Sequence, residues 1–221
     1  MSGNKLRLRF SKFEKAKHIS HLDLMATLRR ALLRAGVGLK YSQGFNPHPY
    51  MSIALPLSVG CSSMCELIDV GTEHDLLPDG LPEIINAVLP EGIEVLSAYA
   101  PLRKFSGIAW VEVEGSMHYD NQPRSIVDDL SRRFSQESII IAKKTKRGVS
   151  EINIAPFIKN MCYNGKGDGT VAMKAMLSAQ NPSVNPYNII DALSNGYASI
   201  APDFAEFTRT EVFDADFKVF S

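Results

Sequence analysis

The amino-acid sequence predicts an α+β protein built from two tandem ferredoxin-like sandwiches, each with the element order β-α-β-β-α-β. Two observations lead to this prediction. Segments of strict polar–apolar alternation, typical of half-buried strands, take turns with segments of helical spacing, and a similar order occurs in each half of the chain. The segment PLRKFSG (101–107) lies between the two series. We therefore expect a first domain at 1–102 and a second, more divergent domain at 103–221.

In the first half, the stretch from Lys5 to Phe10 alternates between basic and apolar residues and is expected to form the first strand. Ser20 is a typical helix N-cap, Asp23 stands in the capping-box position, and the helix is expected to stop at Gly36. The other elements expected in this half are strands at 51–57, 65–71 and 93–100 and a helix at 81–89.

In the second half, the order of elements is similar but includes one additional segment. A hairpin is expected around Lys146-Arg147-Gly148, with the basic residues 143–147 at its tip, and an extra strand or irregular piece near 157–168. The glycine-rich NGKGDG (164–169) lacks the Lys and hydroxyl of a phosphate loop and is interpreted as a hairpin loop. The remaining expected elements are strands at 107–115, 138–144, 150–156, 170–179 and 204–213 and helices at 123–134 and 186–194.

The bulk composition is that of a globular protein. Of 221 residues, 45% are hydrophobic, enough for a packed core, and no apolar run approaches the roughly 18 residues of a membrane span. The opening MSGNKLRLRF has no apolar core of a signal peptide, and three cysteines suggest no disulfide framework. We expect a cytoplasmic protein with no membrane association.

Charge is unevenly distributed along the chain although the net charge is zero. Residues 1–50 hold ten Lys and Arg against two Asp and Glu, whereas residues 51–100 hold eight acidic residues and no basic ones. A basic opening segment suits a polyanionic partner such as RNA. The alternative is that the two segments fold together and neutralise each other.

The first strand carries the first set of candidate binding residues. In a ferredoxin-like sandwich the helices cover one face of the sheet, so Lys5, Arg7 and Arg9 are expected on the open face. A basic open sheet face is a common RNA platform. In the alternative, Glu66 or Asp69 on the neighbouring central strand pairs with these arginines.

The first helix carries the second set. On a helical wheel, Arg30 and Arg34 share the polar face, whereas Arg29 falls inside the apolar arc. A buried arginine needs a carboxylate, carbonyls or a ligand anion, so Arg29 is expected either to meet such a partner or to extend its charged end to the edge of the core.

The stretch YSQGFNPHP (41–49) carries the third set. Gly44 permits a positive φ and the two prolines restrict their neighbours, so the segment is expected to be stiff. In one interpretation Phe45 is a buried anchor and Asn46 caps its own backbone; in the other the loop is a preorganised polar site next to an arginine-bearing helix. The candidate RNA- or anion-binding residues are Arg7, Arg9, Arg29, Arg30, Arg34, Lys40, Ser42, Gln43, Phe45, Asn46 and His48.

No residue pattern assigns catalysis or a cofactor. His18, His21 and His48 are candidate acids or bases, but HISH is not a standard metal-ligand spacing, so no metal site is expected. CSSMC (61–65) is similar to the first part of the cysteine loop that holds a 4Fe–4S cluster in radical SAM enzymes. Ile68 stands where the third cysteine would be, so Cys61 and Cys65 are interpreted as ordinary thiols and no cofactor is expected.

Five stretches together resemble the bacterial radical-SAM-linked domain of unknown function: RLRFSK (7–12), ISHLDLM (19–25), RRALLRAG (29–36), YSQGFNPHP and CELIDV (65–70). The resemblance implies a cytoplasmic protein fused to, or encoded beside, a radical SAM protein, and it brings no settled activity. Its signature falls on Ser20, His21, Asp23, Arg29, Arg30, Arg34, Ser42, Gln43, Gly44, Phe45, Asn46, Pro47, His48 and Pro49.

The first half is also similar, more distantly, to the tandem ferredoxin-like endonucleases that process CRISPR repeats. That resemblance keeps His18 and His21 as candidates, although the chain lacks the C-terminal glycine-rich motif of those enzymes. The sequence thus leads to one main hypothesis, a non-catalytic RNA-binding or substrate-presenting accessory protein that works with a radical SAM enzyme on tRNA or rRNA. A metal-independent RNA endonuclease using His21 or His18, and a protein scaffold without nucleic acid, are the alternatives.

Overall fold

The computed structural model describes residues 4–74, 78–121, 125–145, 148–194 and 197–221, and the chain is an α+β protein. It divides into two compact units, one made of residues 1–107 with Ser221 and the other of residues 108–220. We refer to them as unit 1 and unit 2 and describe each by itself. The division into domains at 102/103 stays a prediction about parts that fold independently.

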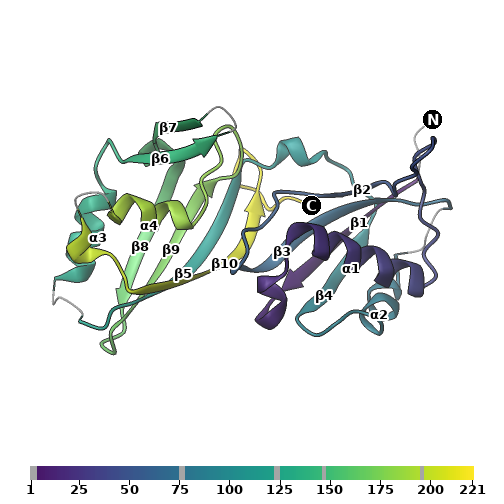
Figure 1. Cartoon of the computed structure of the whole chain (residues 1–221), viewed down its shortest axis with the longest axis horizontal. Helices are drawn as coiled ribbons and strands as arrows, with labels where there is room; N and C mark the ends of the chain where they lie inside the picture. Colours follow the sequence, from purple (N-terminus) through teal and green to yellow (C-terminus); the bar gives the residue numbers. More distant parts are fainter. Residues whose placement is uncertain (1–3, 75–77, 122–124, 146–147, 195–196) are drawn as a thin grey trace. The chain divides into compact units, whose positions relative to one another are not determined.

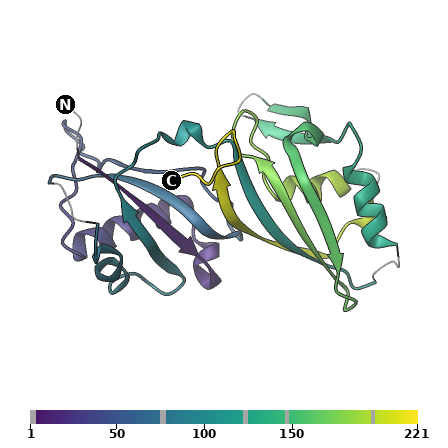
Figure 2. The ribbon, with the colours of Figure 1, turned by 180° about the vertical axis from the view of Figure 1, so that it is seen from behind.

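Unit 1 has the element order expected for the first half of the chain. Its sheet has the order β4-β1-β3-β2, and every neighbouring pair is antiparallel. The two helices lie on the same side of these strands (Figure 1), and the view from behind shows the strands in front of them (Figure 2). The elements are β1 (Lys5–Lys12), α1 (His21–Arg34), β2 (Met51–Ile53), β3 (Ser62–Gly71), α2 (Leu81–Asn86) and β4 (Ile93–Tyr99), with a 3₁₀ turn at Glu14–His18.

The core of unit 1 confirms the alternation of the first strand. Leu6, Leu8 and Phe10 of β1 are buried in one cluster with Leu28 and Leu32 of α1. Alternation along a strand therefore sends the basic side chains of β1 to the opposite face of the sheet.

The start of α1 is also as expected. The Ser20 side chain accepts a hydrogen bond from the Asp23 backbone N–H at 3.1 Å and donates one to the Asp23 carboxylate at 2.7 Å, so both residues of the predicted cap are in place. β2 is shorter than predicted because Leu55 has a positive φ of 47° and Pro56 follows it.

Unit 2 corrects the expected roles of two segments. The predicted hairpin exists, but its strands form a two-stranded sheet of their own. The main sheet has the order β10-β5-β9-β8, so the segment expected to be an extra strand is the one that belongs to it. The elements are β5 (Trp110–His118), α3 (Ile126–Phe134), β6 (Ile140–Thr145), β7 (Gly148–Asn153), β8 (Ile158–Gly165), β9 (Thr170–Ser178), α4 (Tyr187–Ser194) and β10 (Phe204–Phe213).

The glycine-rich stretch 164–169 joins β8 to β9, which confirms its interpretation as a hairpin loop. The Lys166 N–H donates to the Thr170 carbonyl at 2.9 Å, and Gly167 and Gly169 have φ values of 78° and 83°. Lys146 and Arg147 of the predicted basic tip, and the predicted helix start at Pro123, lie outside the described residues. Within the described part of the chain, no helix is long and apolar enough to cross a membrane.

Candidate functional site

The face of the unit 1 sheet opposite the helices carries a buried ion pair. Arg7 on β1 stands directly opposite Asp69 on β3. Its Nε lies 2.6 Å from one carboxylate oxygen of Asp69 and its Nη2 lies 3.0 Å from the other, so the guanidinium engages both oxygens. The Arg7 side chain is 0% exposed, whereas that of Asp69 is 21% exposed.

The segment after β4 closes over Arg7. The Arg103 carbonyl accepts a hydrogen bond from Arg7 Nη2 at 2.8 Å, and the Phe105 ring lies 4.3 Å from the guanidinium carbon. The prediction that Arg7 contacts an external phosphate is therefore wrong, because its charge is paired inside the protein and covered. The alternative, that Asp69 pairs with an arginine of the first strand, is confirmed.

Two other basic residues of β1, Lys5 and Arg9, reach solvent. Lys5 is exposed, and Arg9 is partly exposed. The open face is thus basic at one end of β1 and neutralised at its centre.

A cavity of about 530 Å³ lies at the exposed end of this face. Lys5 and Lys40 line it, together with the aromatic rings of Tyr50 and Phe105. Asp69 is the one carboxylate among its lining residues, and Arg7 already engages that group. The volume is within the usual range for small-ligand sites, and the lining places two lysines beside aromatic surface. The lining residues are Asn4, Lys5, Lys40, Pro49, Tyr50, Met51, Ser52, Asp69, Val70, Gly71 and Phe105.

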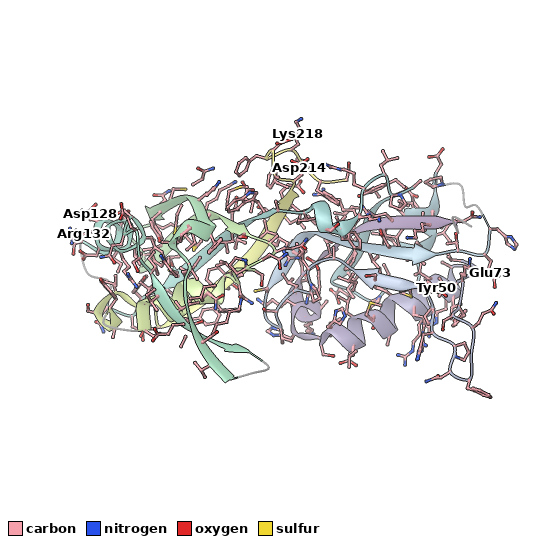
Figure 3. The ribbon with its side chains drawn as sticks, turned by 90° about the horizontal axis from the view of Figure 1, so that it is seen from above. Tyr50, Glu73, Asp128, Arg132, Asp214 and Lys218 are labelled. Atoms are coloured by element: carbon pink, nitrogen blue, oxygen red, sulfur yellow. The ribbon has the colours of Figure 1, made fainter. Side chains whose placement is uncertain are left out.

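The backbone beneath Tyr50 explains how the wall of this cavity is built. The Lys40 N–H donates to the Gly71 carbonyl at 2.9 Å, and the Gly71 N–H donates to the Tyr50 carbonyl at 2.7 Å. A Cβ at position 71 would lie 2.9 Å from the Tyr50 Cβ, so only glycine lets the two segments approach this closely. Figure 3 labels Tyr50 and, beside it at the same end of the unit, Glu73.

The loop 41–49 projects from this base as a closed excursion of the chain. The Tyr50 N–H donates to the Lys40 carbonyl at 2.9 Å, and the Ser42 N–H donates to the His48 carbonyl at 2.8 Å. The Ser42 hydroxyl in turn accepts from the His48 N–H at 2.9 Å. The two arms of the loop are therefore held together at two levels, which agrees with the expected stiffness.

The tip of the loop lies in solvent. Phe45 is 112% exposed, so the interpretation of this ring as a buried anchor is wrong. Gln43, Asn46 and His48 are also exposed, and Gly44 has a φ of 126°, which a side chain would disfavour. A fully exposed aromatic ring on a braced loop is a feature that folding alone does not require.

The arginines of α1 lie on a different part of the unit. Arg29, on the apolar arc of the helical wheel, is exposed, which agrees with the alternative in which its charged end extends from the edge of the core. Arg30 and Arg34 line a separate groove of about 280 Å³ whose other wall is the segment 88–90. Residues of loop 41–49 do not line this groove, and residues of α1 do not line the larger cavity. The helix and the loop thus do not share either of these two cavities.

The candidate histidines are spread over both ends of unit 1. His18 and His21 are exposed at the start of α1, next to the Lys12 end of β1. His48 lies in the loop at the Lys5 end, and an eight-residue strand spans about 26 Å. The structure therefore does not bring His48 together with His18 and His21.

The two cysteines of CSSMC lie at and within a strand. Cys61 directly precedes β3 and Cys65 belongs to it, and both are buried thiols, each 1% exposed. Among the described residues, no group of three or more His, Cys, Asp or Glu side chains is placed to hold a metal ion.

The two aromatic residues of the cavity, Tyr50 and Phe105, were missed by sequence reasoning. Tyr50 directly follows the loop 41–49, and no local pattern marks it as a site residue. Phe105 was missed because 101–107 was interpreted as a boundary, and nothing local indicates that a boundary segment folds back over β1.

These features define an α+β protein whose first unit carries a basic, aromatic cavity beside a projecting loop. The chain belongs to the family described as "Uncharacterized protein conserved in bacteria (DUF2344)", whose model matches residues 5–186. None of the curated proteins compared with the chain matches it.

Among solved structures, the chain is similar to a chain of a Cbf5-Nop10-Gar1 complex, at 14% identity and a TM-score of 0.49, covering 96% of this chain and 50% of that one. It thus spans half the length of that chain. It is also similar to DypB from Rhodococcus jostii RHA1, at 13% identity, a TM-score of 0.21 and coverages of 94% and 93%. A variant of DypB in complex with heme matches at 14% identity, a TM-score of 0.23 and coverages of 95% and 94%. At these values the structures say nothing about what this chain binds.

Proposed function

We propose that this protein is a non-catalytic accessory protein that binds single-stranded RNA through unit 1. The observation that carries the proposal is the cavity in which Lys5 and Lys40 stand beside Tyr50 and Phe105, with its one carboxylate already held by Arg7. Ammonium groups attract phosphates, and aromatic rings stack on bases, so this combination suits a nucleotide chain better than an inorganic anion.

The loop 41–49 adds a second contact in the same proposal. Its exposed Phe45 offers a ring for stacking, and the side chains of Gln43, Asn46 and His48 can form hydrogen bonds with base edges. Because the arms are braced, the ring is presented with little entropy to lose on binding.

We further propose that both units are ferredoxin-like sandwiches in tandem. Support comes from the strand orders, β4-β1-β3-β2 and β10-β5-β9-β8, which place the first and third sheet strands at the centre in each unit. In this interpretation β6 and β7 are a hairpin inserted after α3 of the second sandwich. A sheet covered by helices on one face leaves the other face for a ligand.

The partner and the pathway of the proposal rest on resemblance alone. The stretches shared with the radical-SAM-linked domain suggest that the protein presents its RNA, a tRNA or an rRNA, to a radical SAM enzyme in the bacterial cytoplasm. Cleavage of RNA by His21 or His18, and scaffolding without RNA, remain predictions of the sequence.

Filter binding of a single-stranded RNA at low and high salt tests the proposal. We expect affinity to fall steeply with salt, and Lys40→Ala to weaken binding and to reduce the slope of log K against log salt by about 0.7, one single-strand phosphate contact. Lys15→Ala, an exposed lysine in the turn before α1, is the matched control and is expected to leave the slope unchanged. Absent binding, or equal effects of the two variants, would contradict the proposal. Cleavage that His21→Ala abolishes would establish the nuclease instead.

A further inference from the structure

Unit 2 contains an aromatic surface that the proposed function does not use. Trp110, the only tryptophan of the chain, begins β5, and its ring stacks on Phe217 with the centroids 5.6 Å apart and the planes 22° apart. Val111 and Val113 alternate with Trp110 and are buried, so Trp110 lies on the other face of the sheet. The two rings form a floor on this face, which we call the Trp110–Phe217 floor.

The turn after β10 holds Phe217 in a conformation that costs energy. Phe217 has a φ of 60°, which is unfavourable for an aromatic residue. The Asp214 carboxylate accepts hydrogen bonds from the Asp216 and Lys218 N–H groups, both at 3.0 Å, and the Asp214 N–H donates to the Lys218 carbonyl at 3.0 Å. Figure 3 labels Asp214 and Lys218 in this turn. The turn therefore fixes the ring against Trp110 at a cost to its own backbone.

A lysine covers the floor. Lys159 comes from β8, on the far side of β9, and its Nζ lies 4.3 Å from the Trp110 ring centroid and 4.9 Å from that of Phe217. Lys159 is exposed, and within the described ranges no carboxylate forms an ion pair with it. Its charge thus rests on the two rings, an arrangement that is weak where water can reach it.

Two acids of the same face, Glu112 and Glu114, are engaged by another lysine. The Nζ of Lys174 lies 3.0 Å from Glu112 and 3.2 Å from Glu114, and these two carboxylates raise the pKa of Lys174. Thr210 also donates to Glu112 at 2.6 Å. Glu112 and Glu114, which would otherwise favour an external cation, are thus engaged, whereas the ammonium of Lys159 rests on the rings and can contact an anion.

We infer that the Trp110–Phe217 floor is a second subsite of the proposed RNA-binding protein, in which one unpaired nucleobase stacks on the rings and Lys159 moves aside to contact its phosphate. The inference rests on the proposed function and extends it from unit 1 to unit 2. An aromatic ring face stacks with any base, and a lysine beside the rings can pair with the phosphate that accompanies the base.

The single tryptophan makes the subsite directly measurable. Adenosine and adenosine 5′-monophosphate are titrated into the full-length protein while Trp110 emission is followed, with excitation where adenine does not absorb. We expect both to change the emission and the monophosphate to bind severalfold more tightly. In Lys159→Ala, adenosine should bind about two- to fivefold more tightly because the lysine no longer competes for the rings, and the preference for the monophosphate should disappear.

Two further variants separate the subsite from a merely structural contact. Phe217→Gly removes one ring but accepts the positive φ, so the turn should persist while adenosine binding weakens about tenfold or more. Lys166→Ala, an exposed lysine in the β8–β9 loop, should change nothing. Nucleotide binding that is the same in Phe217→Gly as in the wild type would overturn the inference. So would a Trp110 response to tetramethylammonium chloride with none to the nucleotides, which indicates a cation site.

The inference and the proposed function fail in different ways. RNA binding on filters that Phe217→Gly leaves unchanged would overturn the subsite alone. A Trp110 response to the monophosphate in a protein that retains no RNA on filters would overturn the RNA-binding function and leave a nucleotide site in unit 2.

Discussion

The burial of Arg7 and Arg29 is the reverse of what the sequence patterns indicate. The helical wheel placed Arg29 in the apolar arc and the strand alternation placed Arg7 on an open face, yet Arg7 is the buried arginine and Arg29 the exposed one. Alternation correctly identified the face of the sheet on which Arg7 lies. It could not show that Phe105 and the Arg103 carbonyl, nearly a hundred residues later, cover that face.

The Arg7–Asp69 pair leads to a stability prediction. Asp69→Asn removes the negative charge that the buried guanidinium of Arg7 engages through Nε and Nη2, so the free energy of unfolding should fall by about 3 kcal/mol. Replacing both partners, as Arg7→Met with Asp69→Leu, should recover much of that loss, since neither charge of the pair then remains. Urea unfolding curves measure both, and Asp79→Asn, at an exposed acid, is the control. A double variant no more stable than Asp69→Asn would contradict this account.

Tyr119 gives a prediction for alkaline pH. Its hydroxyl donates to the Ile200 carbonyl at 3.1 Å, and burial, followed by the negative charge of Asp203, raises its pKa from 10.0 to about 12. Because the folded-state pKa is the higher one, its contribution to stability is complete below pH 10 and is lost as the pH rises toward 12. Tyr119→Phe should cost about 1 kcal/mol at neutral pH for the lost hydrogen bond. The stability gap between variant and wild type should then narrow between pH 10 and 12, and a constant gap in unfolding curves would refute the assignment.

At the scale of elements, local patterns found nearly every strand and helix but not the partner of each strand. The caps of α1 and the alternation of β1 are local signals, and both were predicted correctly. The pairing of β9 with β8 was not predicted. The segments of β6 and β7 have the stronger strand pattern, and yet these two strands pair with each other in a separate sheet. Strand pairing depends on how distant segments pack, which a short pattern does not contain. The same limit explains why loop 41–49 was recognised as stiff while the exposure of its tip was left open between two interpretations.

The loop 41–49 provides the prediction at this scale. Phe45 is fully exposed, so Phe45→Ala should leave the free energy of unfolding within about 0.5 kcal/mol of the wild type. If the ring stacks on a base, the same change should weaken RNA binding by about 1–3 kcal/mol. Filter binding and urea unfolding on the same preparation separate the two effects. Leu22→Ala, another exposed apolar side chain, is the control, and an equal loss of RNA binding in both variants would count against a stacking role.

At the scale of the whole molecule, the uneven charge along the chain is only partly neutralised within the fold. Arg7 forms an ion pair with Asp69, an acid of the segment 51–100. This pair agrees with the alternative in which the basic and acidic segments neutralise each other. The other basic residues of the opening segment are mostly exposed, among them Lys5, Lys15, Arg29, Arg30, Arg34 and Lys40. A sequence count therefore established that a basic surface was available, but only the tertiary structure could show which of those charges remain outside.

The sequence and the structure end the first part of the chain at different residues, and two fragments can test the difference. The sequence favoured a first domain ending at 102, whereas the compact unit extends to Gly107 and includes the Arg103 carbonyl and Phe105 ring that cover Arg7. A fragment 1–107 should therefore be more stable than a fragment 1–102 by about 2–4 kcal/mol, the sum of about 1.5–3 for one hydrogen bond to a charged group and about 0.5–1 for one cation–π contact with a partly exposed ring. Urea unfolding of the two fragments, followed by circular dichroism, measures the difference. In fragments that carry Arg7→Met with Asp69→Leu the difference should largely vanish, because the cover then has no charge to satisfy. Equal stability of the unsubstituted fragments would mean that 103–107 is only a linker and that the covering contacts contribute nothing to the fold of unit 1.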